Sequence, residues 1–93
     1  SNRVGLLDRG NISIYPNPVT NGIIQVSVNQ LIKGGLTFSL LNMQGQEMYK
    51  WEKREMFSSA SQETLNLPGH LRGSFLLLIQ SNQEKAAMPV FIH

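Results

Sequence analysis

Short apolar runs separated by turn residues extend along the whole chain, and none is much longer than about eight residues. Within several runs, apolar and polar residues alternate. Ile24, Val26 and Val28 fall on one face of such a run, whereas Gln25 and Ser27 fall on the other. A period of two is typical of a strand with one face in the core and the other in solvent. The pattern therefore predicts a chain built of short β-strands.

Turn residues mark where these strands end, since Gly and Asn tolerate backbone conformations that other residues avoid. The breaks fall at 19–22, 33–35, 42–46, 57–61, 68–69 and 81–84. Strands are expected over residues 12–15, 23–28, 36–42, 48–52, 64–67, 74–79 and 86–92. About seven strands at this spacing predict an all-β fold, an immunoglobulin-like antiparallel β-sandwich, with an open barrel as the lesser alternative.

Residues 46–56 leave a helix as an alternative, because they lack glycine and proline and are rich in Glu, Lys, Met and Arg. Their apolar residues are Met48, Tyr49, Trp51 and Met56. These do not recur at the regular spacing that one face of a helix requires. We therefore favour a strand, joined to the strand over 36–42 by a hairpin in which Gly45 has a positive φ.

The most apolar run, residues 74–79, is the best candidate for a strand buried on both faces. Truncation of Phe75 or Leu77 is expected to unfold the domain. The last strand contains Pro89, which cannot donate a backbone hydrogen bond, and we therefore expect it at a sheet edge.

Residues 15–18 have the sequence Tyr-Pro-Asn-Pro. The residue before each proline is disfavoured in the helical region, and proline fixes its own φ. The segment is therefore predicted to be stiff and extended, and to end the strand that Ile12 and Ile14 begin. On these residues alone, a well-made strand end is the favoured interpretation. For Asn17 we expect a structural role, in which its side chain bonds to a neighbouring turn.

Composition limits the class of protein. The 93 residues, 41% of them hydrophobic and none of them cysteine, fit one small globular domain without disulfides or thiolate metal sites. The net charge is only +2, and the basic residues are spread from Arg3 to Lys85, which argues against a nucleic-acid partner. No apolar run approaches the ~20 residues of a membrane-spanning helix.

The polar stretch Asp8–Asn11 suggests that residues 1–10 are a lead-in or linker and that residues 11–93 are the domain proper. The start lacks the long apolar segment of a signal peptide. We expect Ser1 and Asn2 to be the remnant of a cleaved expression tag, in which case the chain is part of a longer protein.

No catalytic, metal-binding or cofactor-binding constellation is evident. The two histidines, His70 and His93, have no ligand-type residues at metal-site spacing. The serines of residues 58–61 lack a nucleophile elbow. The residues Tyr49, Trp51 and Phe57 could form an aromatic platform for sugars or a peptide, but cross-strand packing is the favoured use. The sequence predicts a protein that is not an enzyme.

Three segments together resemble the type A C-terminal sorting domain of the type IX secretion system, also called the Por secretion system. In that family a Tyr-Pro-Asn-Pro box begins the domain, an Asp-x-x-Gly hairpin follows a central strand, and a Gly-x-Tyr box opens a late strand. The same order occurs here over residues 12–92. The matching positions are Tyr15, Pro16, Asn17, Pro18, Asn42, Gly45, Gly73 and Phe75.

This chain departs from the family pattern in four places. Asn42 replaces the usual Asp, Phe75 replaces the usual Tyr, and residues 70–72 replace a Leu-Pro-Ala type of approach to the late strand. The family's tail is often rich in lysine, whereas Lys85 is the single lysine in residues 85–93 of this chain.

The resemblance implies a non-catalytic domain at the C-terminus of a larger exported cargo protein. Its implied partners are the secretion translocon and a processing protease or sortase at the outer membrane, and the cleaved bond would lie before Asn11. The implied route leads through the periplasm to the cell surface or the extracellular space. Two alternatives stay open, an immunoglobulin-like spacer and a carbohydrate-binding or adhesion module of a cell-surface protein.

Overall fold

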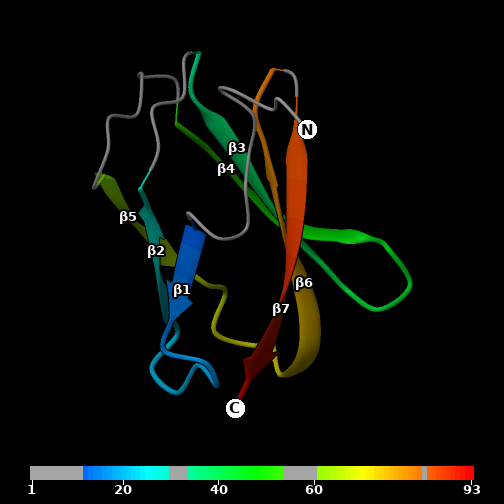
Figure 1. Cartoon of the computed structure of the whole chain (residues 1–93). Helices are drawn as coiled ribbons and strands as arrows, with labels where there is room; N and C mark the ends of the chain where they lie inside the picture. Colours follow the sequence, from blue (N-terminus) through cyan, green and yellow to red (C-terminus); the bar gives the residue numbers. More distant parts are fainter. Residues whose placement is uncertain (1–11, 30–33, 54–60, 83) are drawn as a thin grey trace.

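The structure, a computed structural model, describes residues 12–29, 34–53, 61–82 and 84–93, and these contain seven strands and no helix (Figure 1). The strands are β1 (Ile12–Tyr15), β2 (Ile23–Val28), β3 (Leu36–Leu41), β4 (Glu47–Lys53), β5 (Ser61–Asn66), β6 (Gly73–Gln80) and β7 (Lys85–Ile92). The all-β prediction is confirmed. The expected lead-in over residues 1–10 and loop over residues 57–60 lie outside the described residues.

Two antiparallel sheets face each other. The first has the strand order β1-β2-β5 and the second has the order β4-β3-β6-β7. In the immunoglobulin constant type, the fourth strand joins the sheet of the first, second and fifth strands. Here β4 pairs with β3 instead, so that the sheets have three and four strands. The predicted immunoglobulin-like sandwich is thus confirmed, in place of the open barrel.

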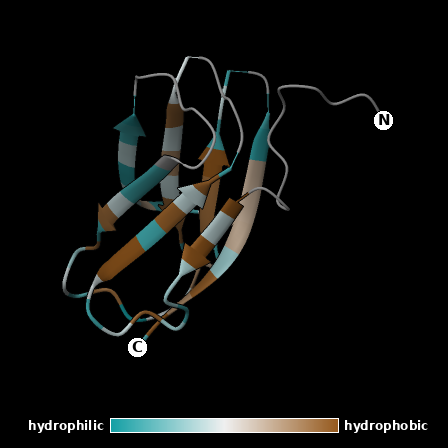
Figure 2. Cartoon of the chain, turned by 60° about the vertical axis from the view of Figure 1, so that its left-hand side comes forward, coloured by the Kyte–Doolittle hydropathy of each residue, from teal (hydrophilic) through white to brown (hydrophobic). Residues whose placement is uncertain are grey.

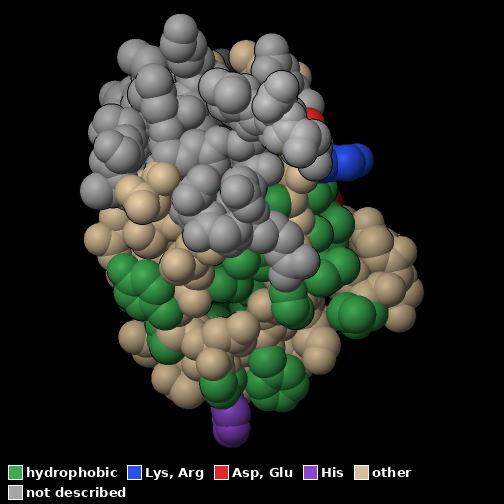
Figure 3. Space-filling view, in the orientation of Figure 1, with side chains coloured by type: hydrophobic (Ala, Val, Ile, Leu, Met, Phe, Trp, Pro, Cys, Tyr) green, Lys and Arg blue, Asp and Glu red, His purple; other side chains and the backbone are tan. Residues whose placement is uncertain are grey.

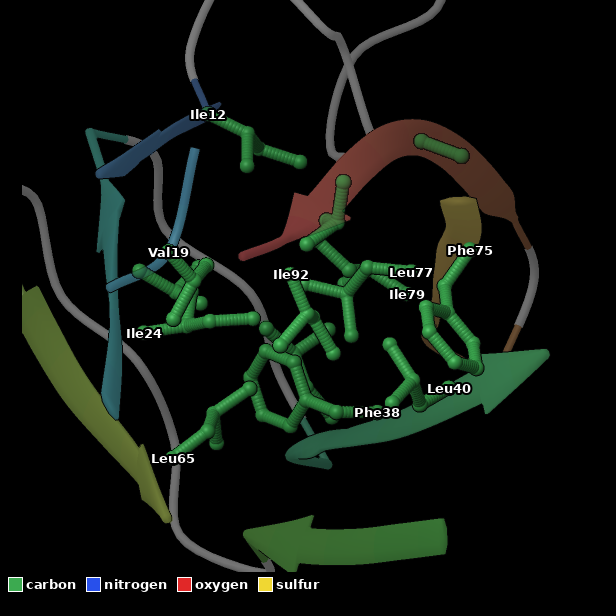
Figure 4. Packing of buried hydrophobic residues seen from close by; sticks show 14 of the residues in the cluster. Ile12, Val19, Ile24, Phe38, Leu40, Leu65, Phe75, Leu77, Ile79 and Ile92 are labelled. Carbon is green, nitrogen blue, oxygen red and sulfur yellow. The ribbon is translucent and has the colours of Figure 1, made fainter. Parts of the chain in front are cut away.

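The core lies between the inner faces of the two sheets, as Figure 4 shows for its central side chains. Ile24, Val26 and Val28 of β2 are at most 1% exposed, as their alternation predicts. The alternation is visible along the strands in Figure 2. From the second sheet, Phe38 and Leu40 of β3 meet the inner side chains of β6. Burial of this apolar area is the main stabilising contribution in a domain this small.

Strand β6 corrects one prediction. It is central, between β3 and β7, but only its inner residues Phe75, Leu77 and Ile79 are buried. Leu76 and Leu78, on the outer face, are half-buried. A two-layer sandwich has no third layer to cover the outer face of a sheet. The apolar outer residues therefore need a different explanation from core packing.

Strand β7 is an edge strand, as Pro89 predicts. The carbonyl of Pro89 points away from β6 and accepts a hydrogen bond from outside the sheet. Because the N and the carbonyl of one residue in an antiparallel strand point to the same side, the missing N–H also lies on the outer edge. Pro89 therefore leaves the ladder with β6 intact.

The remaining boundaries are close to those expected. Residues 47–53 form a strand rather than a helix, and residues 54–56 lie outside the described residues. β5 begins at Ser61, earlier than predicted, and Leu67 lies just beyond its end but still packs against the core. Val19, expected in a turn, is a buried core residue at 1% exposure. Among the described residues, no helix is long and apolar enough to cross a membrane.

Candidate functional site

The three sequence boxes contribute to one shallow groove beside β7. Asn17 comes from the first box, Met43 from the hairpin, and Ser74 and Phe75 from the start of β6. The rest of the lining is Leu76, Pro89, Val90 and Phe91. Segments that are far apart in the chain therefore meet at one place, and this groove is the candidate site.

Asn17 attaches the first box to the outer edge of β7. Its Nδ2 donates to the carbonyl of Pro89 at 3.1 Å, and its Oδ1 accepts from the N–H of Phe91 at 3.1 Å. The side-chain amide thus makes the two hydrogen bonds that a neighbouring strand would make. An edge that would otherwise be open to strand addition is occupied.

Val19 continues this attachment by its backbone. Its N–H donates to the carbonyl of Phe91 at 2.7 Å, and its carbonyl accepts from the N–H of His93 at 2.8 Å. Its side chain enters the core. We call residues 17–19, together with residues 89–93 of the last strand and its end, the clasp. The clasp joins the chain that leaves the first sheet to the edge of the second.

The Tyr-Pro-Asn-Pro stretch is bent over residues 16–18, which corrects the prediction of an extended segment. Both peptide bonds that precede a proline, after Tyr15 and after Asn17, are cis. β1 does end at Tyr15, as predicted. The stretch has to pass from one sheet to the other before Asn17 reaches β7, and a straight continuation of β1 would not reach that edge. Tyr15 itself lies on the first sheet, where its hydroxyl accepts from Nε2 of Gln62.

Asn42 organises the hairpin between β3 and β4. Its Oδ1 accepts from the backbone N–H of Gln44 at 3.0 Å and of Gln46 at 2.9 Å. Gly45 has φ of +87°, in the region that favours glycine, as predicted. A carboxylate at position 42 offers the same acceptor oxygen, so that Asn in place of Asp preserves the turn chemistry.

The late box has a different role for each residue. Gly73 begins β6 with φ of +105°. Phe75 is 6% exposed and packs inward opposite Val90. The approach is ordered by Leu71, which is buried, and by Arg72, whose Nη1 donates to the carbonyls of Gly69 and Leu71. The backbone N–H of Leu71 donates to the carbonyl of Pro68 at 3.3 Å, so that a turn at Gly69 and His70 leads into the residues that replace the family's Leu-Pro-Ala approach.

Two of the predicted residues, Asn17 and Phe75, line the groove, and the others do not: Tyr15, Pro16, Pro18, Asn42, Gly45, Gly73 and Lys85. Lys85 is exposed at the first position of β7, opposite Gln80 and at the other end of the strand from Phe91. Sequence reasoning missed Val19, Met43 and Phe91. Phe91 could have been found from the sequence, because the outward positions near it in the last strand are also apolar. A two-layer fold does not need apolar residues at such positions.

The geometry contains little that could perform chemistry. Among the described residues, no group of three or more His, Cys, Asp or Glu side chains could hold a metal ion. His70 is exposed in the turn before β6, and His93 is exposed at the end of the chain. The groove is lined by side chains without charge. Its arrangement is suited to binding an apolar group.

The aromatic residues of β4 pack against the sandwich. The rings of Tyr49 and Trp51 lie edge to face, with centroids 4.8 Å apart and planes at 68°. Trp51 is half-buried against the core, opposite Phe38 on β3. Phe57, the third residue of the suggested platform, lies outside the described residues. This geometry favours cross-strand packing over a flat sugar platform.

Residues 13–93 match a protein family described as secretion system C-terminal sorting domain. No curated protein matches the chain. A solved structure of a β-glucuronidase from Faecalibacterium prausnitzii is similar in fold, with a TM-score of 0.63 and 14% sequence identity. The similarity covers 88% of this chain but 14% of that one, so it concerns a small part of the larger protein and the fold alone.

Proposed function

The chain belongs to the family of secretion system C-terminal sorting domains, the sorting signals of type IX secretion, and on this basis we propose that it directs a larger cargo protein across the outer membrane to the cell surface. The cargo reaches the translocon through the periplasm. A processing protease or sortase at the outer membrane then cleaves the chain within residues 1–10. Residues 11–93 are the folded label, and they take part by being recognised rather than by catalysing a reaction.

The clasp is the observation that supports this proposal beyond family membership. Asn17 and Val19 occupy the edge of β7, and Asn17 also lines a groove to which the other two boxes contribute Met43, Ser74 and Phe75. The boxes that mark the family in sequence therefore build one local structure. A spacer module needs no such convergence, whereas a label that is recognised in folded form needs a constant surface.

Family membership also bears on the remaining alternative. A carbohydrate-binding module would need an exposed aromatic platform, and only Tyr49 of the β4 pair is substantially exposed, at 45%. Sorting domains as a family are non-catalytic, in agreement with the uncharged groove. The sorting function is therefore favoured over sugar binding.

The test is a transfer experiment. The 93-residue chain is fused to the C-terminus of an inert passenger that carries a signal peptide, in a bacterium with a type IX system. We expect the passenger to become accessible to antibody and protease on intact cells. The matched control is the same passenger without the domain, which should stay in the periplasm. A fused passenger that also stays in the periplasm would refute the proposal.

A further inference from the structure

The outer face of the second sheet is apolar where a solvated face would be polar. In an antiparallel sandwich the outer face commonly carries polar side chains. Here the cross-strand neighbours Leu41, Leu76 and Pro89 form one row, and Leu78 and Ala87 lie in the next. Phe91 and Met43 lie at the groove end and are 46% and 63% exposed. We call these seven residues the apolar strip.

Charge on this face lies on its two edge strands, β4 and β7. β6 contains no charged residue, and β7 contains only Lys85 at its far end. On β4, at the border of the sheet, the exposed Glu47 lies opposite Leu41 of the strip, and the exposed Lys50 lies near Glu52. In Figure 3, which has the orientation of Figure 1, hydrophobic side chains are scattered among uncharged ones on the described part of the surface in view, and the few charged side chains in view lie at the upper right. Exposed apolar surface of this kind is typical of an interaction site.

The clasp determines how a partner can approach. Exposed sheet edges commonly bind a partner by strand addition. At residues 89–93 of this edge the outward backbone groups already bond to Asn17 and Val19. A partner at this end must therefore contact the side chains of the face rather than the backbone of the edge.

We propose that the apolar strip is the surface by which the sorting domain docks on the export machinery, and that the groove accepts an uncharged aliphatic or aromatic side chain that protrudes from a protein of that machinery. The proposal rests on the sorting function proposed above. The partner surface is uncharged because a charge buried against this strip would lose its hydration without gaining a counter-charge.

Two other occupants fit the strip less well. In a twofold dimer a groove on the symmetry axis would face its own equivalent, which a concave surface does not fill. A lipid surface with anionic headgroups favours basic residues around an apolar patch. Lys85 is the one basic residue on the β6 and β7 part of this face.

The experiment places a charge on the strip of the full chain fused to the passenger. Phe91→Lys and Met43→Lys change exposed side chains, and Ser13→Lys adds the same charge to the exposed outer face of β1 as a matched control. We expect Phe91→Lys and Met43→Lys to lower the surface-exposed fraction of the passenger by about tenfold, since hot-spot contacts are sensitive to single changes. Ser13→Lys should leave that fraction unchanged. All three should melt within a few degrees of the unaltered domain.

Photo-crosslinking identifies the occupant in living cells. A photoreactive phenylalanine analogue at position 91 should form an adduct with an outer-membrane component of the type IX machinery. The same analogue at position 15, exposed on the other sheet, should not. An adduct between two copies of the chain, or adducts with lipid alone, would overturn the proposal. So would export of the Phe91→Lys and Met43→Lys variants at the level of the Ser13→Lys variant.

The two proposals can fail separately. If the unaltered fusion is exported and the Phe91→Lys and Met43→Lys variants are too, the docking surface alone is wrong. If the unaltered fusion is not exported, the sorting function is wrong as well.

Discussion

At the residue scale, the side chains of two asparagines in the family boxes make hydrogen bonds that backbone groups would make in regular secondary structure. Asn17 supplies the hydrogen bonds of a neighbouring strand to β7, and Asn42 holds the hairpin by accepting from two backbone N–H groups. Both use a short side chain with fixed geometry. The family boxes are thus explained in this chain largely by backbone hydrogen bonding.

Asn17→Ala should destabilise the domain by about 1–2 kcal/mol, because two backbone groups of β7 lose their partner and turn to water. For a domain of this size, each kcal/mol lowers the melting temperature by about 4–8 °C. The control is Asn66→Ala, at an exposed position at the end of β5. Thermal unfolding followed by circular dichroism measures both. Equal melting temperatures for the two variants would show that the hydrogen bonds of Asn17 in the clasp contribute nothing to stability.

Gly45→Ala should cost about 1 kcal/mol or more, because alanine is strained at the φ of +87° that this glycine adopts. A Cβ there would meet no atom within 4 Å, so that the cost is conformational and not steric crowding by neighbours. Gly69 has equally open surroundings and no positive φ, and Gly69→Ala should be nearly neutral. Urea unfolding distinguishes the two. A Gly69→Ala variant as unstable as Gly45→Ala would contradict this explanation.

At the element scale, local patterns predicted the strands well and long-range contacts poorly. The alternation of Ile24, Val26 and Val28 is contained in six consecutive residues, so it was visible in the sequence. Asn17 and Phe91 are separated by 74 positions, and no local pattern connects them. Val19 follows a proline in a segment of turn residues, and nothing nearby indicates that β7 draws it into the core.

Strand β6 shows a second reason for failure. A run of apolar residues is what a doubly buried strand requires, but it is also what a strand with an apolar binding face requires. Sequence alone does not distinguish the two, because the number of layers is a property of the whole fold. The candidate groove was equally hidden, since its lining comes from four separate parts of the chain.

Phe75→Ala should remove about 3–5 kcal/mol, the usual cost of truncating a buried phenylalanine, which is a large part of the stability of a small domain. Leu78→Ala on the outer face of the same strand should cost much less, because Leu78 is only half-buried. Denaturant unfolding of both variants provides the comparison. If Phe75→Ala keeps the melting temperature of the unaltered domain, the assignment of the core is wrong.

At the scale of the whole molecule, two features of the sandwich suit it to be carried at the end of another protein. The C-terminal half of β7 is closed at its outer edge by the clasp, which limits unwanted strand pairing there. The second sheet presents an apolar face to a partner, whereas the exposed charges of β4 lie at the opposite edge of that sheet. A small domain can therefore resist strand pairing at one sheet edge and still present a surface that a partner recognises.

The most direct measurement is the surface-exposed fraction of the passenger fusion in two strains, one with an intact type IX system and one that lacks its outer-membrane translocon. Sorting by this domain predicts passenger on the surface of the first strain and in the periplasm of the second. Expression and folding are equal in both strains, so the difference isolates the export step. The same distribution in the two strains would contradict the central claim that this domain is a type IX sorting signal.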